Sequence, residues 1–344
     1  MPPVRFAAGA TRIEIVLMLA LALPVVAQAR TQARIEPQRS GVDVRLRGIS
    51  AVDADIAWAS GRAGTVLRTR DGGVTWENVS VPGAEQLDFR DVEAFDADHA
   101  VVLSIGNGAA SRIYRTANGG RNWILVLHNG DERAFFDCMV FEGMRGWMLG
   151  DPVDGRFQIH ATHDGGRRWT LLPDGPQAAA GEAAFAASGT CIARGEGTLL
   201  VGGSGPARLH VKGDGDDAWR TFDSGMSRNK SEAGLFSIAA VGQDAVIVGG
   251  DYTAERLPGN ATLWSAADGT SVQVLAPPRG YRSGVACAGS TQACVAVGPA
   301  GVDAWNGEIW TPVTNTGYDA IDLAGKAGWV SGDGGRIARI AIGD

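Results

Sequence analysis

The chain has 344 residues, of which 45% are hydrophobic and 20% are charged, a balance typical of globular proteins rather than disordered or fibrous ones. Its 49 glycines and 10 tryptophans indicate many tight turns and repeated aromatic packing. The formal net charge of −7 argues against sequence-independent binding of nucleic acid, which requires a basic surface.

The N-terminal segment has the pattern of a signal peptide. Two arginines flank an apolar run at residues 15–26, and an Ala-Gln-Ala cleavage pattern ends at Ala29. The run is shorter than the roughly 20 residues that a helix needs to span a bilayer. We therefore expect a cleaved signal peptide at 1–29 and a periplasmic or secreted mature protein at 30–344. An uncleaved anchor is the alternative.

An eight-residue turn motif occurs three times in register. The copies read TRDGGVTW (69–76), TANGGRNW (116–123) and THDGGRRW (162–169). We interpret the motif as a structural turn, in which Asp or Asn accepts backbone hydrogen bonds, glycine supplies positive φ and tryptophan packs between blades. An Asn in the second copy argues against a catalytic carboxylate. The structural residues are Asp71, Gly72, Trp76, Asn118, Trp123, Asp164 and Trp169.

Two further β-favouring runs precede each motif, and seven such units occupy residues 30–344. Their length of about 45 residues is that of a four-stranded propeller blade. The sequence therefore predicts an all-β, single-domain, seven-bladed β-propeller. Its innermost opener strands are expected at 46–52, 89–95, 135–141, 182–188, 235–241, 281–287 and 318–324. Residues 34–45 are expected to supply the missing outer strand of the last blade and to close the ring.

Three arginines occupy the second position of their opener strands, namely Arg47, Arg90 and Arg282. Alternate residues of a strand share one face, and the openers of a propeller line its central channel. We therefore expect the three arginines at one mouth of the channel, where they could hold a carboxylate. The alternative is that they are solvated or paired with acidic neighbours such as Asp91 and Asp319.

The longest irregular connections are expected on the face where the openers begin, opposite the repeated turns. They bring further polar side chains to the same rim, namely Asp151, Asp154, Glu182, Asp251, Tyr252 and Tyr281. A glycosidase would need two carboxyls roughly 5–9.5 Å apart, and the four acids of this rim are the candidates.

The four cysteines are expected in an oxidising compartment. Cys287 and Cys294 flank a turn-like insert between two apolar runs, which predicts a disulfide across a hairpin. Whether Cys138 and Cys191 pair is left open. The spacing of cysteine and histidine residues does not indicate a metal site, so we predict no metal.

The repeated turn resembles the Asp-box, or bacterial neuraminidase repeat, of sialidases and other propellers. Over the whole mature chain, the order of opener, Gly-Trp strand and turn resembles the photosystem II stability and assembly factor family. GDPVDGRF (150–157), GEAAFAASG (181–189), GGDY (249–252) and PRGYRS (278–283) resemble an exported bacterial branch of that family. Members of this branch are often described as oxidoreductases or glycosyl hydrolases. The resemblance implies a propeller that chaperones a membrane-complex precursor.

Two functions from different classes follow. We favour a monomeric, non-catalytic propeller without a cofactor, which binds a protein or peptide at the channel mouth. The alternative is a sialidase-like glycoside hydrolase. A dinucleotide-dependent oxidoreductase finds no support, because no G-x-G-x-x-G lies between a strand and a helix and the glycine cluster at 202–205 favours a turn.

Overall fold

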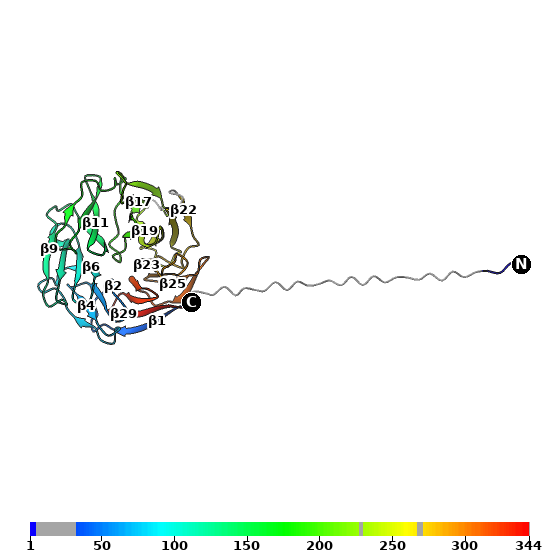
Figure 1. The fold of residues 1–344 in the computed structure, drawn as a ribbon, viewed down its shortest axis with the longest axis horizontal. Helices are drawn as coiled ribbons and strands as arrows, with labels where there is room; N and C mark the ends of the chain where they lie inside the picture. Colours follow the sequence, from blue (N-terminus) through cyan, green and yellow to red (C-terminus); the bar gives the residue numbers. More distant parts are fainter. Residues whose placement is uncertain (5–31, 227–229, 267–270, 344) are drawn as a thin grey trace. The chain divides into compact units, whose positions relative to one another are not determined.

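The computed structural model describes residues 1–4, 32–226, 230–266 and 271–343. Seven antiparallel sheets form a ring of blades, which confirms the predicted seven-bladed β-propeller (Figure 1). The blades belong to the unit Thr31–Asp344. The helical structure within the described ranges is one short 3-10 turn, η1 (Gly108–Ala110). No described helix is long and apolar enough to cross a membrane. The predicted signal peptide lies almost wholly outside the described residues.

The blades follow one another in chain order. Blade 1 contains β2 (Leu46–Ala51), β3 (Ala57–Gly61), β4 (Val66–Thr69) and β5 (Glu77–Asn78). Blade 2 contains β6 (Asp88–Ala94), β7 (Ala100–Ile105), β8 (Arg112–Thr116) and β9 (Ile124–His128). Blade 3 contains β10 (Phe136–Glu142), β11 (Arg145–Val153), β12 (Arg156–Thr162) and β13 (Thr170–Leu171). Blade 4 contains β14 (Ile192–Gly195), β15 (Thr198–Gly202), β17 (Arg208–Gly213) and β18 (Arg220–Asp223).

The remaining blades follow the same plan. Blade 5 contains β19 (Lys230–Val241), β20 (Asp244–Asp251), β21 (Asn260–Ser265) and β22 (Ser271–Val274), with the short β16 (Ser204–Gly205) paired to β19. Blade 6 contains β23 (Gly284–Cys287), β24 (Cys294–Gly298), β25 (Gly301–Trp305) and β26 (Trp310–Thr314). Blade 7 contains β27 (Ala320–Ala324), β28 (Ala327–Ser331), β29 (Arg336–Gly343) and β1 (Gln32–Arg39).

The ring is closed by β1, which pairs antiparallel with β29 from Gln32 opposite Gly343 to Arg39 opposite Arg336. This confirms that the segment before the first opener supplies the outer strand of the last blade. Closure leaves blade 7 with the same four strands as its neighbours, so its two faces can be buried between blades 6 and 1.

The fourth opener was predicted wrongly. The innermost strand of blade 4 is β14, which begins at Ile192, whereas residues 182–188 form no strand. The five consecutive apolar residues at 183–187 resemble a buried strand, yet they are buried or half-buried because the segment lies in the channel mouth. Burial alone therefore produced the misleading pattern.

Each repeated turn is held by its own side chains. In the first copy, Thr69 Oγ1 accepts a 2.8 Å hydrogen bond from the Gly73 amide, and Asp71 Oδ1 accepts one of 2.9 Å from the Thr75 amide. The Gly72 amide donates to the Asp55 carbonyl, which follows the end of β2, so this turn lies at the far end of the opener from Arg47. We call this end of the propeller the turn face.

The motif tryptophans pack against aromatic rings between or beside the blades. Trp123 of blade 2 lies edge-on to Trp58 of blade 1, with ring centroids 6.3 Å apart. Trp76 of blade 1 lies edge-on to Trp329 of blade 7, at 6.5 Å. Trp169 packs edge-on to Phe141, at 5.7 Å. The first two contacts join successive blades through aromatic packing, whereas the third lies within blade 3, because Phe141 belongs to β10.

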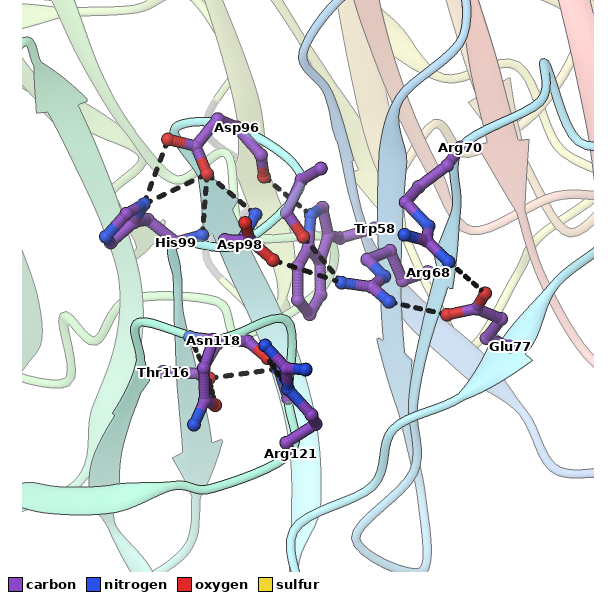
Figure 2. A network of polar contacts seen from close by, with 12 residues as sticks. Trp58, Arg68, Arg70, Glu77, Asp96, Asp98, His99, Thr116, Asn118 and Arg121 are labelled. Carbon is purple, nitrogen blue, oxygen red and sulfur yellow. Dashed lines mark hydrogen bonds and ion pairs between the residues drawn. The ribbon is translucent and has the colours of Figure 1, made fainter.

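On the turn face, cations are neutralised by neighbouring groups, as the contact between blades 1 and 2 shows (Figure 2). Arg68 lies over the Trp58 ring, at 5.5 Å from its centroid, and bonds to Glu77 and to the Ala97 carbonyl. Arg70 also pairs with Glu77, at 2.8 Å. The bond from Arg68 to the Ala97 carbonyl joins blade 1 to blade 2, whereas the pairs with Glu77 lie within blade 1.

Two disulfides are present. Cys287 and Cys294 lie directly opposite each other on β23 and β24, which confirms the predicted bridge. Cys138 of β10 is bonded to Cys191, the residue before β14, so the second bridge joins blades 3 and 4. The sequence had left this second pairing open, because distance along the chain does not show that the two innermost strands are neighbours.

Candidate functional site

A cavity of about 430 Å³ lies at the channel mouth opposite the turn face. We call it the mouth cavity. Its arginines come from blades 1 and 2, and its aromatic side chains come from blades 5 and 6, from the connection between blades 3 and 4 and from Phe135, just before β10 of blade 3. The residues that the argument uses are Arg45, Arg47, Arg90, Asp137, Asp151, Phe185, Phe236, Tyr252, Tyr281 and Asp319. Five of the nine rim residues predicted from the sequence are among them.

Arg47 and Arg90 are brought together as the opener pattern predicted, because both stand at the start of an innermost strand, β2 or β6. Arg47 Nε donates to the Ala187 carbonyl at 3.0 Å, and Arg90 Nη1 donates to the Ala186 carbonyl at 2.8 Å. Burial, together with the positive charge of Arg90, lowers the pKa of Arg47 to about 10. Arg90 also pairs with Asp88 at 3.1 Å, whereas Arg47 makes no ion pair among the described residues, so Arg47 supplies the unpaired positive charge that favours an anion.

Arg282 departs from the prediction. Its side chain is fully buried, pairs with Asp303 of β25 and donates through Nη1 to the Tyr281 carbonyl at 2.9 Å. The reason is that β23 begins only at Gly284, so Arg282 precedes the strand and its side chain turns into blade 6. Arg45 and Arg62 line the mouth cavity beside Arg47 and Arg90 instead.

Arg45 was missed because it lies one residue before the predicted opener. Its guanidinium makes two 2.7 Å hydrogen bonds with the carboxylate of Asp319 in blade 7. This bidentate pair leaves Arg45 already neutralised. Asp319 was named from the sequence as a neighbour that could pair with a mouth arginine, and the structure places it with Arg45.

Besides Asp319, three carboxyls line the mouth cavity, namely Asp137, Asp151 and Glu255. Asp151 accepts a 2.8 Å hydrogen bond from the Ala184 amide, and burial raises the pKa of Asp151. Asp137 is buried, and its Oδ2 makes no hydrogen bond within the described part of the chain. Burial and the nearby charge of Asp151 raise the pKa of Asp137 well above its ordinary value. Sequence reasoning missed Asp137, although it aligns with Asp91 at the third opener position.

The other predicted carboxyls do not line the mouth cavity. Glu182 is buried and pairs with Arg208 and with His210 Nε2, and although burial opposes ionisation, these hydrogen bonds hold its pKa at about 2. Asp154 is exposed on the hairpin between β11 and β12. Asp251 pairs with Lys230 at 3.1 Å. Each carboxylate was predicted from its loop position, which does not fix the direction of its side chain.

Aromatic rings form the other part of the cavity. Phe185 stacks on Phe236 with centroids 3.6 Å apart, and Phe236 contacts the Tyr281 ring at 4.6 Å. Tyr252 lies edge-on to both phenylalanines at 6.3 Å and remains 47% exposed. Phe185 and Tyr252 thus offer apolar surface beside two arginines, a combination suited to a ligand with one apolar and one anionic group.

Farther inside the channel, a second cavity of about 260 Å³ is lined by Asp91, Glu93 and Asp322. Asp91 accepts a 2.6 Å hydrogen bond from the Met139 amide of the next blade, rather than pairing with an arginine. Burial raises the pKa of all three carboxyls, that of Asp322 to about 6. Among the described residues no group of three His, Cys, Asp or Glu side chains is arranged to hold a metal ion.

Comparison with known proteins shows the fold. No family model matches the chain, and no curated protein is similar to it in sequence. Among solved structures, YCF48 bound to a D1 peptide is similar with a TM-score of 0.64 and 15% identity, covering 96% of this chain and 100% of that one. YCF48 from Cyanidioschyzon merolae gives 0.63 and 19%, covering 90% and 99%. The WD40 propeller domain of Doa1 gives 0.62 and 13%, covering 90% and 97%.

Proposed function

We propose that this protein is a non-catalytic propeller that binds a protein or peptide partner through the mouth cavity. The observation that carries the proposal is the convergence of Arg47 and Arg90 with Phe185 and Tyr252 in one cavity. A peptide end or an acidic side chain beside an apolar residue matches these groups. The solved YCF48 structure with a D1 peptide, similar in fold, supports a peptide as the ligand class.

Peptide binding by arginine variants tests the proposal. Binding of a library of short peptides with free carboxyl ends is measured by fluorescence anisotropy, and each hit is repeated as its amide. Because a hydrogen bond to a charged group contributes about 1.5–3 kcal/mol, Arg47→Ala or Arg90→Ala should weaken binding by roughly 10- to 150-fold. Arg70→Ala on the turn face is the matched control and should bind as the unaltered protein does. Unchanged binding in both mouth variants contradicts the proposal.

The hydrolase alternative is tested on a panel of chromogenic glycosides and sialosides. Asp137, Asp151, Glu255 and Asp319 are the carboxyls that line the mouth cavity, and Asp319 is committed to Arg45, whereas Glu182 is committed to Arg208 and His210. Turnover that is abolished by Asp151→Asn would overturn the non-catalytic proposal.

We further propose that the chain is exported to the periplasm or beyond, cleaved after Ala29, and built from repeats of the Asp-box type. The two disulfides and the sequence pattern at 1–29 support export. Intact-mass measurement of protein from a periplasmic extract tests it. A mass that retains residues 1–29 would favour the uncleaved anchor.

A further inference from the structure

The mouth cavity is partly occupied by the protein's own chain. Residues 183–189, which we call the channel segment, connect blade 3 to blade 4 without forming a strand. The carbonyls of Ala186 and Ala187 accept the hydrogen bonds from Arg90 and Arg47 described above. Arg47 and Arg90 thus each already hold a backbone carbonyl of this segment, and Arg90 Nε also donates to Asp88 Oδ2 at 3.1 Å.

The channel segment is fastened by contacts with several blades. Ser188 Oγ donates to the Ser283 carbonyl of blade 6 at 2.6 Å, and the Phe185 ring stacks on Phe236 of blade 5. Gly189 has a φ of 82°, and a Cβ atom there would lie 2.4 Å from Asp91 Oδ1 of blade 2. Glycine lets the chain approach this carboxylate.

The segment presents the groups that an external peptide would present. An aromatic side chain fills the apolar part of the cavity, and the next two residues offer oxygen acceptors to the two arginines. We infer that the channel segment is an internal ligand, which competes with the partner for Arg47 and Arg90. The inference rests on the proposed function and specifies its ligand: a peptide with an aromatic residue two positions before an anionic acceptor.

Charge explains why an external peptide can displace the segment. A carbonyl is a neutral acceptor, whereas a carboxylate adds the attraction between two opposite charges to its hydrogen bond with a guanidinium. Arg90 already pairs with Asp88 at 3.1 Å, but Arg47 makes no ion pair within the described part of the chain, so its charge lacks a carboxylate to offset the repulsion from Arg90. A carboxylate would cancel it, whereas the channel segment has the advantage of being covalently attached.

The test uses acetyl-Phe-Ala-Ala with a free carboxyl end, which copies Phe185, Ala186 and Ala187 and adds the anion. Its amide is the neutral control. Binding is measured by titration calorimetry on the mature protein and on Ser188→Ala, which removes the hydrogen bond that anchors the segment. Losing one such bond should tighten binding of the acid by about two- to tenfold. Ser290→Ala, which removes an exposed hydrogen bond in the hairpin between β23 and β24, outside the mouth cavity, should not tighten it.

Hydrogen–deuterium exchange on the unaltered protein supplies a second readout. Saturation with the acid should speed exchange of amides 184–190, because the segment leaves the arginines. Ser188→Ala that binds the acid no more tightly, or exchange that stays unchanged or slows on binding, overturns the internal ligand while leaving the proposed function standing. Binding that survives both Arg47→Ala and Arg90→Ala, or no binding by any variant, overturns both.

Discussion

Arginine at the second position of the predicted opener strands occupies two different environments in this propeller. Arg47 and Arg90 face the mouth cavity, whereas Arg282 is buried against Asp303. The sequence pattern predicted the first two because β2 and β6 include the aligned position, and it failed for Arg282 because β23 starts two residues later. Strand starts are set by tertiary packing, which a repeat alignment does not contain.

Breaking the buried ion pair should destabilise the fold. Asp303→Asn leaves the charge of Arg282 buried without its carboxylate, and removing one partner of such a pair costs about 3–5 kcal/mol. The free energy of unfolding, measured by urea titration, should fall by that amount. Asp154→Asn, at an exposed carboxylate, is the control and should change it little. Equal free energies of unfolding for the two variants would contradict the burial of the Arg282–Asp303 ion pair.

At the scale of elements, the repeat predicted strands well where each blade follows the common plan. The turn motifs and openers of blades 1–3 were located because three copies support one another. The opener of blade 4 was not located, because this blade lacks a full copy of the turn motif. In addition, the chain between Leu172 and Cys191 enters the channel. Phe185 could not be assigned to the site from the sequence, because its stacking on Phe236 depends on that path.

The two disulfides should contribute unequally to stability. The Cys138–Cys191 bridge spans 53 residues and joins two blades, while the Cys287–Cys294 bridge spans 7 residues within one hairpin. Loop-closure entropy predicts about 4 kcal/mol for the first and about 2 kcal/mol for the second. Urea unfolding of the two double Cys→Ala variants should show the larger loss for the first pair. The opposite ranking would contradict the entropic account.

At the scale of the whole molecule, carboxyls inside the ring should make stability depend on pH. The pKa of Asp322 is about 6 in the folded protein, above its ordinary value of 3.8, so the folded state binds this proton more tightly than the unfolded chain. The resulting stabilisation is complete below about pH 4 and is lost as the pH rises through about 6. Asp91 and Glu93 shift in the same direction.

Asp322→Asn should therefore reduce the fall in melting temperature between pH 4.5 and pH 7.5. The amide oxygen can still accept the hydrogen bond that the Ala51 amide gives to Asp322 at 2.7 Å, so the contact with blade 1 is kept. Thermal unfolding across this pH range is the measurement. Asp43→Asn, at an exposed carboxylate, should leave the profile unchanged. An unaltered profile in Asp322→Asn would contradict the assignment.

Ring closure by β1 should be essential to the whole molecule. A chain that starts at residue 40 loses the strand that pairs with β29 and also loses Ile35, which packs on the core of blades 6 and 7. We expect a lower melting temperature and concentration-dependent association, because the edge of β29 is exposed. A chain that starts at residue 31 is the control. Equal melting temperatures for the two chains would contradict the prediction.

The pairing of β1 with β29 also sets an order for folding during synthesis. The ribosome makes β1 among the first strands and its partner last, so most blades can form while blade 7 still lacks a strand. During that interval β1 has no partner strand and the ring of blades is open. Only a chain that has been translated through β29 can close the ring. Ring closure therefore depends on complete synthesis of blade 7.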